Sequence, residues 1–363
     1  MNIKVDTQEL RTLLETTARV STKHITLPVL QCVLLEAKNK SLTIKATNLE
    51  IGIEGKINAA VESDGVVAVP AQTLLQTINL ISQKTTTLTL QDDILYIETK
   101  ISKTEIKSIP SDEFPHIPKI KGEKQTINSS VFALGIKATA FAASQSSIKP
   151  ELGSIYVFQK KEHSLTYVAT DSFRLMEKTT PQQNLVFQNP ILIPYKNALE
   201  LARIAELEED TITLYVNENQ CAIETASIYI TSRLTSGTFP DYEQIIPKEY
   251  ITHATTLTSD LHHALKKTNI FLNRFMQLTL TVHKDTITLS SQSGEVGTTT
   301  ESINASVEGD DITLNFNQKY ISEIMGHIVD DSITLHFAGI GRPMVIESVH
   351  DRSIRYLVMP MNK

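Results

Sequence analysis

Two hydrophobic patterns alternate along the chain. In the first, apolar residues recur at helical spacing: after Asp6, residues Leu10, Leu13 and Leu14 fall on one face, and Glu9 follows Asp6 as in a capping box. In the second, apolar residues alternate with Thr, Ser and Tyr over short runs, which is typical of strands in antiparallel sheets. The chain is therefore predicted to be an α+β protein.

The same pattern occurs three times. Residues 41–55, SLTIKATNLEIGIEG, align with residues 164–178, SLTYVATDSFRLMEK, and more weakly with residues 286–300. The strings TTLTL, TITLY and SITLH form a second set that follows in the same order. We therefore predict three copies of a unit of about 120 residues.

Each copy contains two segments with helical periodicity. The six segments span residues 7–19, 70–84, 129–145, 194–206, 259–274 and 316–329. Pro70 and Pro194 stand at the start of two segments, and we expect them in the first helical turn, where a missing N–H costs nothing. In the last segment, Ile321, Ile324 and Met325 lie on one face. We predict that each copy packs two helices on antiparallel sheets.

Proline-containing segments separate the copies. Residues 110–125 and 235–250 each contain Phe-Pro followed by a second proline. Proline fixes its own φ and disfavours helix at the preceding residue, so both segments are expected to be extended connectors. The predicted domains are residues 1–122, 123–248 and 249–363.

The sequence shows little that suggests enzyme chemistry. It contains no GxxxxGK[ST] phosphate loop, no HExxH or CxxC metal motif and no GxSxG nucleophile motif. His262 and His263 are adjacent and would point in different directions on a helix, so they do not form a metal-binding pair. We expect no catalytic residues, no metal and no cofactor, and we interpret the chain as a binding or structural protein.

The cysteines and the N-terminus indicate the compartment. Cys32 and Cys221 lie in strand-like apolar runs and are expected to be buried thiols of a protein in a reducing compartment. The start, MNIKVDTQEL, does not have the basic and apolar segments of a signal peptide, and no run of about 18 apolar residues occurs. We expect a cytoplasmic protein with no membrane contact.

The charge is distributed unevenly. The chain has 34 Lys and Arg against 41 Asp and Glu, a net charge of −7, which taken alone disfavours a nucleic acid partner. The six predicted helical segments nevertheless carry a net charge of about +4. Either a few side chains produce this difference by chance, or the helices share a surface that faces a polyanion.

Four strings resemble one protein family. ITLPVL (25–30), VATDSFRL (168–175), FPDYEQIIP (239–247) and the terminal YLVMPMNK occur where the bacterial sliding clamp, the beta subunit of the DNA polymerase III holoenzyme, has comparable strings. The resemblance extends over the whole chain. It implies three similar domains per subunit and a head-to-tail homodimer that closes into a six-domain ring, with helices lining the hole.

The resemblance also implies a function. It describes a non-catalytic processivity factor that encircles and slides on duplex DNA and tethers its partners through a hydrophobic cleft. The implied partners are nonspecifically bound duplex DNA, the replicative DNA polymerase, the clamp loader, and repair polymerases and other clamp-motif proteins. The alternative is a non-catalytic, triplicated ligand-binding or adhesion protein with no DNA partner.

Site residues follow from the resemblance by matching positions. The implied partner-peptide pocket contains Leu152, Thr170, Ser172, Arg174, Leu175, Pro240, Ile245, Met344, Val358, Met359, Pro360 and Met361. The implied DNA-facing residues are Lys23, His24, Lys137, Lys149, Lys196, Arg203, Lys266 and Lys267. The implied dimer interface includes Ile106, Ile270 and Phe271. The residues that depart from those common in the family, and so leave the peptide preference open, are Ser172, Phe173, Gln244, Asn362 and Lys363.

Overall fold

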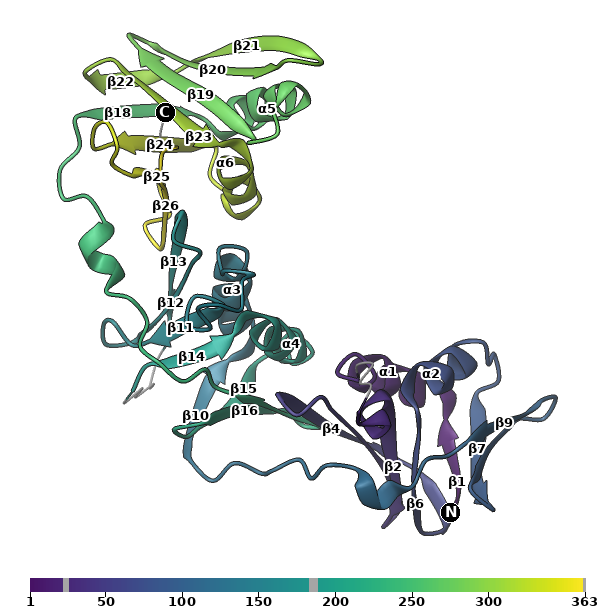
Figure 1. Ribbon diagram of the computed structural model, residues 1–363. Coiled ribbons are helices and arrows are strands. Elements are labelled where there is room, and N and C mark those ends of the chain that lie inside the picture. Colours follow the sequence, from purple (N-terminus) through teal and green to yellow (C-terminus); the bar gives the residue numbers. More distant parts are fainter. Residues whose placement is uncertain (22–25, 183–188, 362–363) are drawn as a thin grey trace. The chain divides into compact units, whose positions relative to one another are not determined.

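The computed structural model describes residues 1–21, 26–182 and 189–361 (Figure 1). The chain forms two compact units. Unit 1 contains residues 1–133 and 196–234, and unit 2 contains residues 134–195 and 235–363. The strands of the middle copy are divided between the two units.

Unit 1 contains two antiparallel sheets. The five-stranded sheet has the order β5 (Ala60–Ser63), β1 (Asn2–Asp6), β7 (Thr85–Gln91), β8 (Ile94–Glu98) and β9 (Lys103–Lys107). The eight-stranded sheet has the order β10 (Glu123–Asn128), β15 (Thr211–Val216), β16 (Gln220–Glu224), β17 (Ile228–Arg233), β4 (Ile51–Asn58), β3 (Ser41–Thr47), β2 (Cys32–Lys38) and β6 (Gly65–Pro70). Because β17 pairs with β4, strands of the first and second copies form one continuous sheet.

Unit 2 repeats this arrangement. Its nine-stranded sheet has the order β14 (Ile191–Pro194), β11 (Ser154–Phe158), β12 (Ser164–Thr170), β13 (Arg174–Pro181), β26 (Ile354–Val358), β25 (Met344–Ser348), β24 (Ser332–Phe337), β18 (Thr252–Leu257) and β22 (Ser306–Gly309). Its four-stranded sheet has the order β21 (Gly297–Asn304), β20 (Thr286–Ser293), β19 (Gln277–His283) and β23 (Ile312–Asn317). Here β13 of the second copy pairs with β26 of the third.

The prediction of two helices in each copy is confirmed. The helices are α1 (Thr7–Thr17), α2 (Ala71–Asn79), α3 (Ser129–Ala140), α4 (Tyr195–Ala205), α5 (Thr258–Thr268) and α6 (Gln318–Ile324). Asp6 caps α1 by accepting hydrogen bonds from the backbone N–H groups of Gln8 and Glu9. The expected place of the two prolines was wrong by one residue: Pro70 and Pro194 end strands β6 and β14, and the helices start after them.

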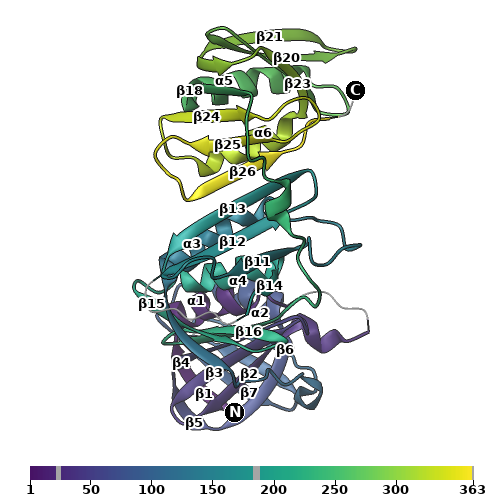
Figure 2. The same cartoon turned by 90° about the vertical axis from the view of Figure 1, so that its left-hand side faces the viewer.

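One core joins the helices and both sheets of unit 2. Leu261 and Leu265 of α5 and Ile321 and Ile324 of α6 are buried among side chains from strands of both sheets. In Figure 2, α5 lies next to the four-stranded sheet and α6 lies beside β24 and β25. The helical stripe predicted at Ile321 is therefore confirmed as a core face.

The two cysteines are free thiols in the protein core. Cys32 and Cys221 are buried, and burial raises the pKa of Cys32 to about 11 and that of Cys221 to about 12. These thiols stay protonated near neutral pH and behave as small core residues. Among the described residues, no helix has the length and apolar character needed to cross a membrane.

Candidate peptide-binding surface and charged helices

The joint between β13 and β26 brings part of the implied peptide pocket together. Leu175 lies opposite Leu357, which lies opposite Val345. These three side chains are packed with Phe239 and Tyr242 of the second connector in one apolar cluster. One face of this joint therefore carries apolar strand residues covered by the connector.

A tight turn shapes the end of this joint. Asp171 accepts hydrogen bonds on Oδ1 from the backbone N–H groups of Phe173 and Arg174, both at 3.0 Å. The Thr170 hydroxyl donates to the Arg174 carbonyl at 2.6 Å. Ser172 has a φ of 76°, and Phe173 is 60% exposed. The turn thus fixes the backbone and presents a large apolar side chain to solvent.

The C-terminal tail is hydrogen-bonded beside this turn. The Met359 N–H donates to the Phe173 carbonyl at 2.8 Å, and the Met361 N–H donates to the Asn315 carbonyl at 2.7 Å. The side chains of Met359, Pro360 and Met361 are half-buried. The tail therefore lies on the surface of unit 2 and leaves methionine and proline side chains partly accessible.

The second connector is anchored on the same face. The Phe239 ring stacks on Tyr156 with centroids 4.8 Å apart, and the Tyr242 hydroxyl donates to Glu177 Oε2 at 2.5 Å. Burial and this carboxylate raise the pKa of Tyr242. Pro240, between these inward anchors, is exposed, and Ile245, three residues after Tyr242, is 48% exposed. The contacts of Phe239 and Tyr242 thus fix the positions of the exposed Pro240 and Ile245.

Three residues of the implied pocket are placed differently. Met344 and Val358 are fully buried and pair with each other on the opposite face of the sheet from Leu175, because successive strand side chains point to opposite faces. Leu152 is also buried. Leu357, which is not among the implied pocket residues, lies on the face of the sheet that the connector covers.

Arg174 is a buried structural residue in this structure. It forms ion pairs with Asp171 at 3.0 Å and with Glu323, and it donates to the Phe141 carbonyl at 2.7 Å. Its guanidinium also lies over the Tyr320 ring at 4.6 Å. These contacts join the turn to α6 and to Phe141, directly after α3, and leave the Arg174 side chain little exposed surface.

The implied DNA-facing residues are mainly exposed helix and loop cations. Lys23 and His24 lie outside the described residues. The exposed members are Lys137, Lys149, Lys196, Lys266 and Lys267. Lys267 pairs with Glu301 at 2.9 Å, and half-buried Arg203 pairs with Glu200 at 2.9 Å. Two of these cations are therefore partly neutralised by neighbouring carboxylates.

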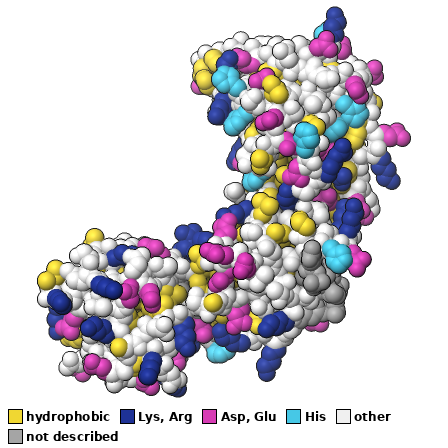
Figure 3. All heavy atoms as spheres, turned by 180° about the vertical axis from the view of Figure 1, so that it is seen from behind, with side chains coloured by type: hydrophobic (Ala, Val, Ile, Leu, Met, Phe, Trp, Pro, Cys, Tyr) yellow, Lys and Arg dark blue, Asp and Glu magenta, His cyan; other side chains and the backbone are white. Residues whose placement is uncertain are grey.

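The charge of the helices is smaller than expected. Within the observed bounds the six helices hold seven Lys and Arg and five Asp and Glu, a net charge of about +2. The estimate of about +4 was too high because three cations, Arg19, Lys84 and Arg274, and one anion, Glu206, lie beyond the helix ends. On the face shown in Figure 3, basic and acidic side chains are interspersed.

The implied interface residues differ in exposure. Ile270 is 64% exposed and Phe271 is half-buried beside Gly297. Ile106 is only 5% exposed, because it lies on the covered face of the five-stranded sheet. Strands β9 and β21, which carry or adjoin these residues, are edge strands of their sheets.

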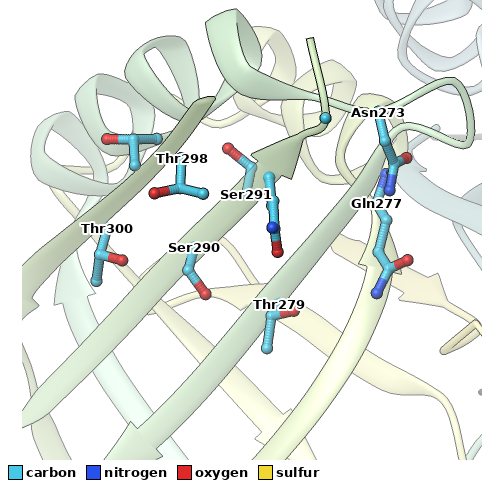
Figure 4. A pocket seen from close by; sticks show the side chains of 10 residues that line it. Asn273, Gln277, Thr279, Ser290, Ser291, Thr298 and Thr300 are labelled. Carbon is cyan, nitrogen blue, oxygen red and sulfur yellow. The ribbon is translucent and has the colours of Figure 1, made fainter. Parts of the chain in front are cut away.

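A second surface feature of unit 2 is a polar hollow of about 490 Å³ on the four-stranded sheet. Uncharged side chains such as Thr279, Ser290 and Thr300 project from neighbouring strands, with Asn273 and Gln277 at one end (Figure 4). Its lining holds no Lys, Arg, Asp, Glu or His. In the part of the chain that the structure describes, no group of His, Cys, Asp and Glu residues could hold a metal ion.

Comparisons with known proteins identify the family. Models of the N-terminal, central and C-terminal domains of the DNA polymerase III beta subunit match residues 1–118, 126–241 and 243–362. The beta sliding clamp of Staphylococcus aureus is 26% identical over 365 residues, which covers 96% of each chain.

Solved structures show the same fold. The DNA polymerase sliding clamp of Pseudomonas aeruginosa has a TM-score of 0.94 at 22% identity and covers 100% of both chains. The DNA polymerase III beta subunit of Thermotoga maritima has a TM-score of 0.94 at 24% identity, over 100% of this chain and 99% of that one.

These matches define a processivity factor of DNA replication. The chain belongs to the family of the DNA polymerase III beta subunit, the bacterial sliding clamps. The alternative of an adhesion-type repeat protein is not favoured.

Proposed function

We propose that two copies of the chain close head to tail into a ring around duplex DNA. Each subunit contributes three domains, residues 1–122, 123–248 and 249–363. Edge strands β9 and β21 and the exposed Ile270 support this arrangement, because an uncovered strand edge invites pairing with another chain. A homodimer joined in this way through two equivalent contacts forms a closed assembly.

Inside the ring, exposed cations such as Lys137, Lys196 and Lys266 attract phosphates without reading sequence. The modest positive charge of the helices is compatible with sliding, because tight base-specific contacts would oppose translation along the duplex. Retention on DNA then comes from the closed ring. The protein needs no catalytic group or cofactor for this task, and it acts in the cytoplasm.

Partner proteins bind at the peptide surface of unit 2. The observation that carries this proposal is the C-terminal tail, which is hydrogen-bonded beside Phe173 with Met359 to Met361 partly accessible. It follows Leu357, which packs with the connector that exposes Pro240 and Ile245. Methionine side chains adapt to different neighbours, which suits a surface shared by several partners. We assign the replicative polymerase, the clamp loader and repair polymerases to this surface.

Deletion of residues 359–363 tests the proposal. Sliding clamps of Pseudomonas aeruginosa and Bartonella birtlesii bind griselimycin in solved structures, so this compound and the cognate polymerase serve as ligands. We expect the truncated chain to keep the mass of a dimer and to lose binding of both ligands in calorimetric titration. Unchanged binding would refute the peptide surface, and a monomeric full-length chain would refute the ring.

A further inference from the structure

The joint between β17 and β4 in unit 1 has the same turn as the joint between β13 and β26 in unit 2. Asn48 Oδ1 accepts hydrogen bonds from the backbone N–H groups of Glu50 and Ile51 at 3.0 and 2.9 Å. Asp171 makes the same two hydrogen bonds in unit 2. Leu49 has a φ of 75°, equal within a degree to that of Ser172.

The neighbouring strand is also placed alike. In unit 1 the Arg233 N–H donates to the Glu50 carbonyl at 2.8 Å. In unit 2 the Met359 N–H donates to the Phe173 carbonyl at 2.8 Å. Arg233 therefore occupies in the first joint the place that Met359 of the C-terminal tail occupies in the second.

Strand register and connector complete the correspondence. Thr231 lies opposite Gly52 in unit 1 as Leu357 lies opposite Leu175 in unit 2. The first connector reads Phe-Pro-His-Ile (114–117) where the second reads Phe-Pro-Asp-Tyr (239–242). Each connector crosses its joint and buries its fourth residue there.

A cavity lies at this position in unit 1. It has a volume of about 210 Å³ and is lined by residues that include Thr47, Leu49, Gly52, Pro115, Ile117 and Arg233. Pockets for whole drug-sized ligands are about 300 to 1,000 Å³, so this cavity fits one side chain better than a complete small molecule. Gly52 allows Ile117 to pack closely against β4 in this lining, because a Cβ there would lie 2.9 Å from Ile117 Cγ2.

We propose that this cavity is a second peptide-binding site, which takes one apolar side chain of a short extended segment from a partner protein. The inference extends the peptide-binding role proposed for unit 2 to its internal counterpart. Leu49, Pro115 and Ile117 supply apolar walls. The lining also holds Glu50 and Arg233, and the arginine favours an acidic residue next to the inserted side chain. Thr231, at the place of Leu357, makes the cavity more polar than the surface in unit 2, so we expect weak binding, with a Kd of about 1 mM.

Methyl NMR of the full chain with labelled isoleucine tests both sites in one sample. Ile117 reports on the cavity in unit 1 and Ile245 on the surface in unit 2. The probes are acetyl-Leu-Asp-amide, its charge-inverted counterpart acetyl-Leu-Lys-amide, and griselimycin. We expect acetyl-Leu-Asp-amide to shift the Ile117 signal saturably, acetyl-Leu-Lys-amide to bind at least about fivefold more weakly, and griselimycin to shift Ile245.

Two exposed substitutions and a matched control complete the experiment. Leu49→Ser, which introduces the residue found at the equivalent place in unit 2, and Arg233→Glu should each weaken the Ile117 response at least about fivefold. Arg352→Glu changes an exposed arginine of unit 2 and should leave it unchanged. No saturable shift of Ile117, or equal binding of the two dipeptides, overturns this proposal. If griselimycin does not shift the Ile245 signal, the peptide surface proposed for unit 2 is overturned instead.

Discussion

The two joints between copies have the same geometry and different chemistry. Along β4, the joint of unit 1 has Ile51 and Gly55 where the equivalent positions of β13 in unit 2 hold Arg174 and Lys178, both buried. In unit 1 the glycine allows close approach: a Cβ on Gly55 would lie 2.2 Å from Leu13 Cδ1 of α1. Close backbone packing therefore secures one joint, and buried ion pairs secure the other.

Two glutamates at equivalent positions, Glu54 and Glu177, hold the connectors in different ways. Glu54 of β4 pairs with Lys119 of the first connector at 3.4 Å, near the surface. Glu177 of β13 is buried, accepts the Tyr242 hydroxyl, and also pairs with Lys160 at 3.2 Å. The repeat thus fixes where a connector is held, while the residues at each joint decide how firmly and which side chains remain exposed for partners.

The largest expected effect is at Arg174. Arg174→Ala leaves Asp171 and Glu323 without their buried partner, which should cost about 3 to 5 kcal/mol of unfolding free energy. Arg19 pairs with Glu200 at 3.3 Å on the surface of unit 1, so Arg19→Ala should cost at most about 1 kcal/mol. Urea denaturation compares the two variants. Equal losses would mean that the buried pairs do not secure the joint of unit 2.

A larger side chain at Gly55 should destabilise the joint of unit 1, because β4 packs closely against α1 there. Gly55→Ala places a Cβ against Leu13 and should cost about 1 to 3 kcal/mol, with the loss located in unit 1 by hydrogen exchange. Gly294→Ala is the matched control, because a Cβ there meets no atom within 4 Å. A neutral effect of Gly55→Ala would show that α1 moves freely away from β4.

Two tyrosines that form hydrogen bonds at the connectors, Tyr242 in the second connector and Tyr229 in β17, give a smaller and more specific comparison. Tyr242→Phe removes a hydrogen bond to a buried carboxylate and should cost about 1.5 to 3 kcal/mol. Tyr229→Phe removes an hydroxyl that accepts from the Ile120 N–H at 2.8 Å and donates to the Pro118 carbonyl, and should cost about 0.5 to 1.5 kcal/mol.

Only Tyr242→Phe should weaken polymerase binding, because only Tyr242 holds the connector that exposes Pro240 and Ile245. A loosened connector reduces the fraction of molecules in the conformation that binds the polymerase. We therefore expect a lower association rate, measured by biolayer interferometry. Tyr215→Phe, which breaks an exposed tyrosine–glutamate hydrogen bond of 2.6 Å in unit 1, serves as the control. A loss confined to the dissociation rate would indicate a direct contact instead.

The sequence predicted the elements better than their connections. Helical stripes and Thr-rich alternation located six helices and the repeat, because these signals are local. The pairing of β17 with β4 and of β13 with β26 depends on contacts between distant segments, which no local pattern encodes. The same limitation applies to the C-terminal tail: position matching located it, but only the strand register shows that Leu357 faces the connector and Val358 the opposite side of the sheet.

The smallest expected effect is a pH dependence confined to unit 2. Burial lowers the pKa of His327 and of His336, and both belong to unit 2. His336 Nδ1 lies 2.6 Å from His253 Nδ1, and its ring also faces Glu347 and Tyr250. Because these folded-state pKa values lie below the ordinary value of about 6.5, the unfolded state binds more protons, and stability is lost as the pH falls through that value.

Hydrogen exchange between pH 7 and pH 5, corrected for the intrinsic rate, should therefore show β24 losing protection before β7 of unit 1. His336→Gln removes one titrating group and should reduce the difference, whereas His116→Gln changes an exposed histidine of unit 1 and should not. The acidic residues with lowered pKa values, Asp330 and Asp351, exert their effect only below about pH 4. Equal loss of protection in β7 and β24 above pH 5 would show that these histidines do not distinguish the two joints.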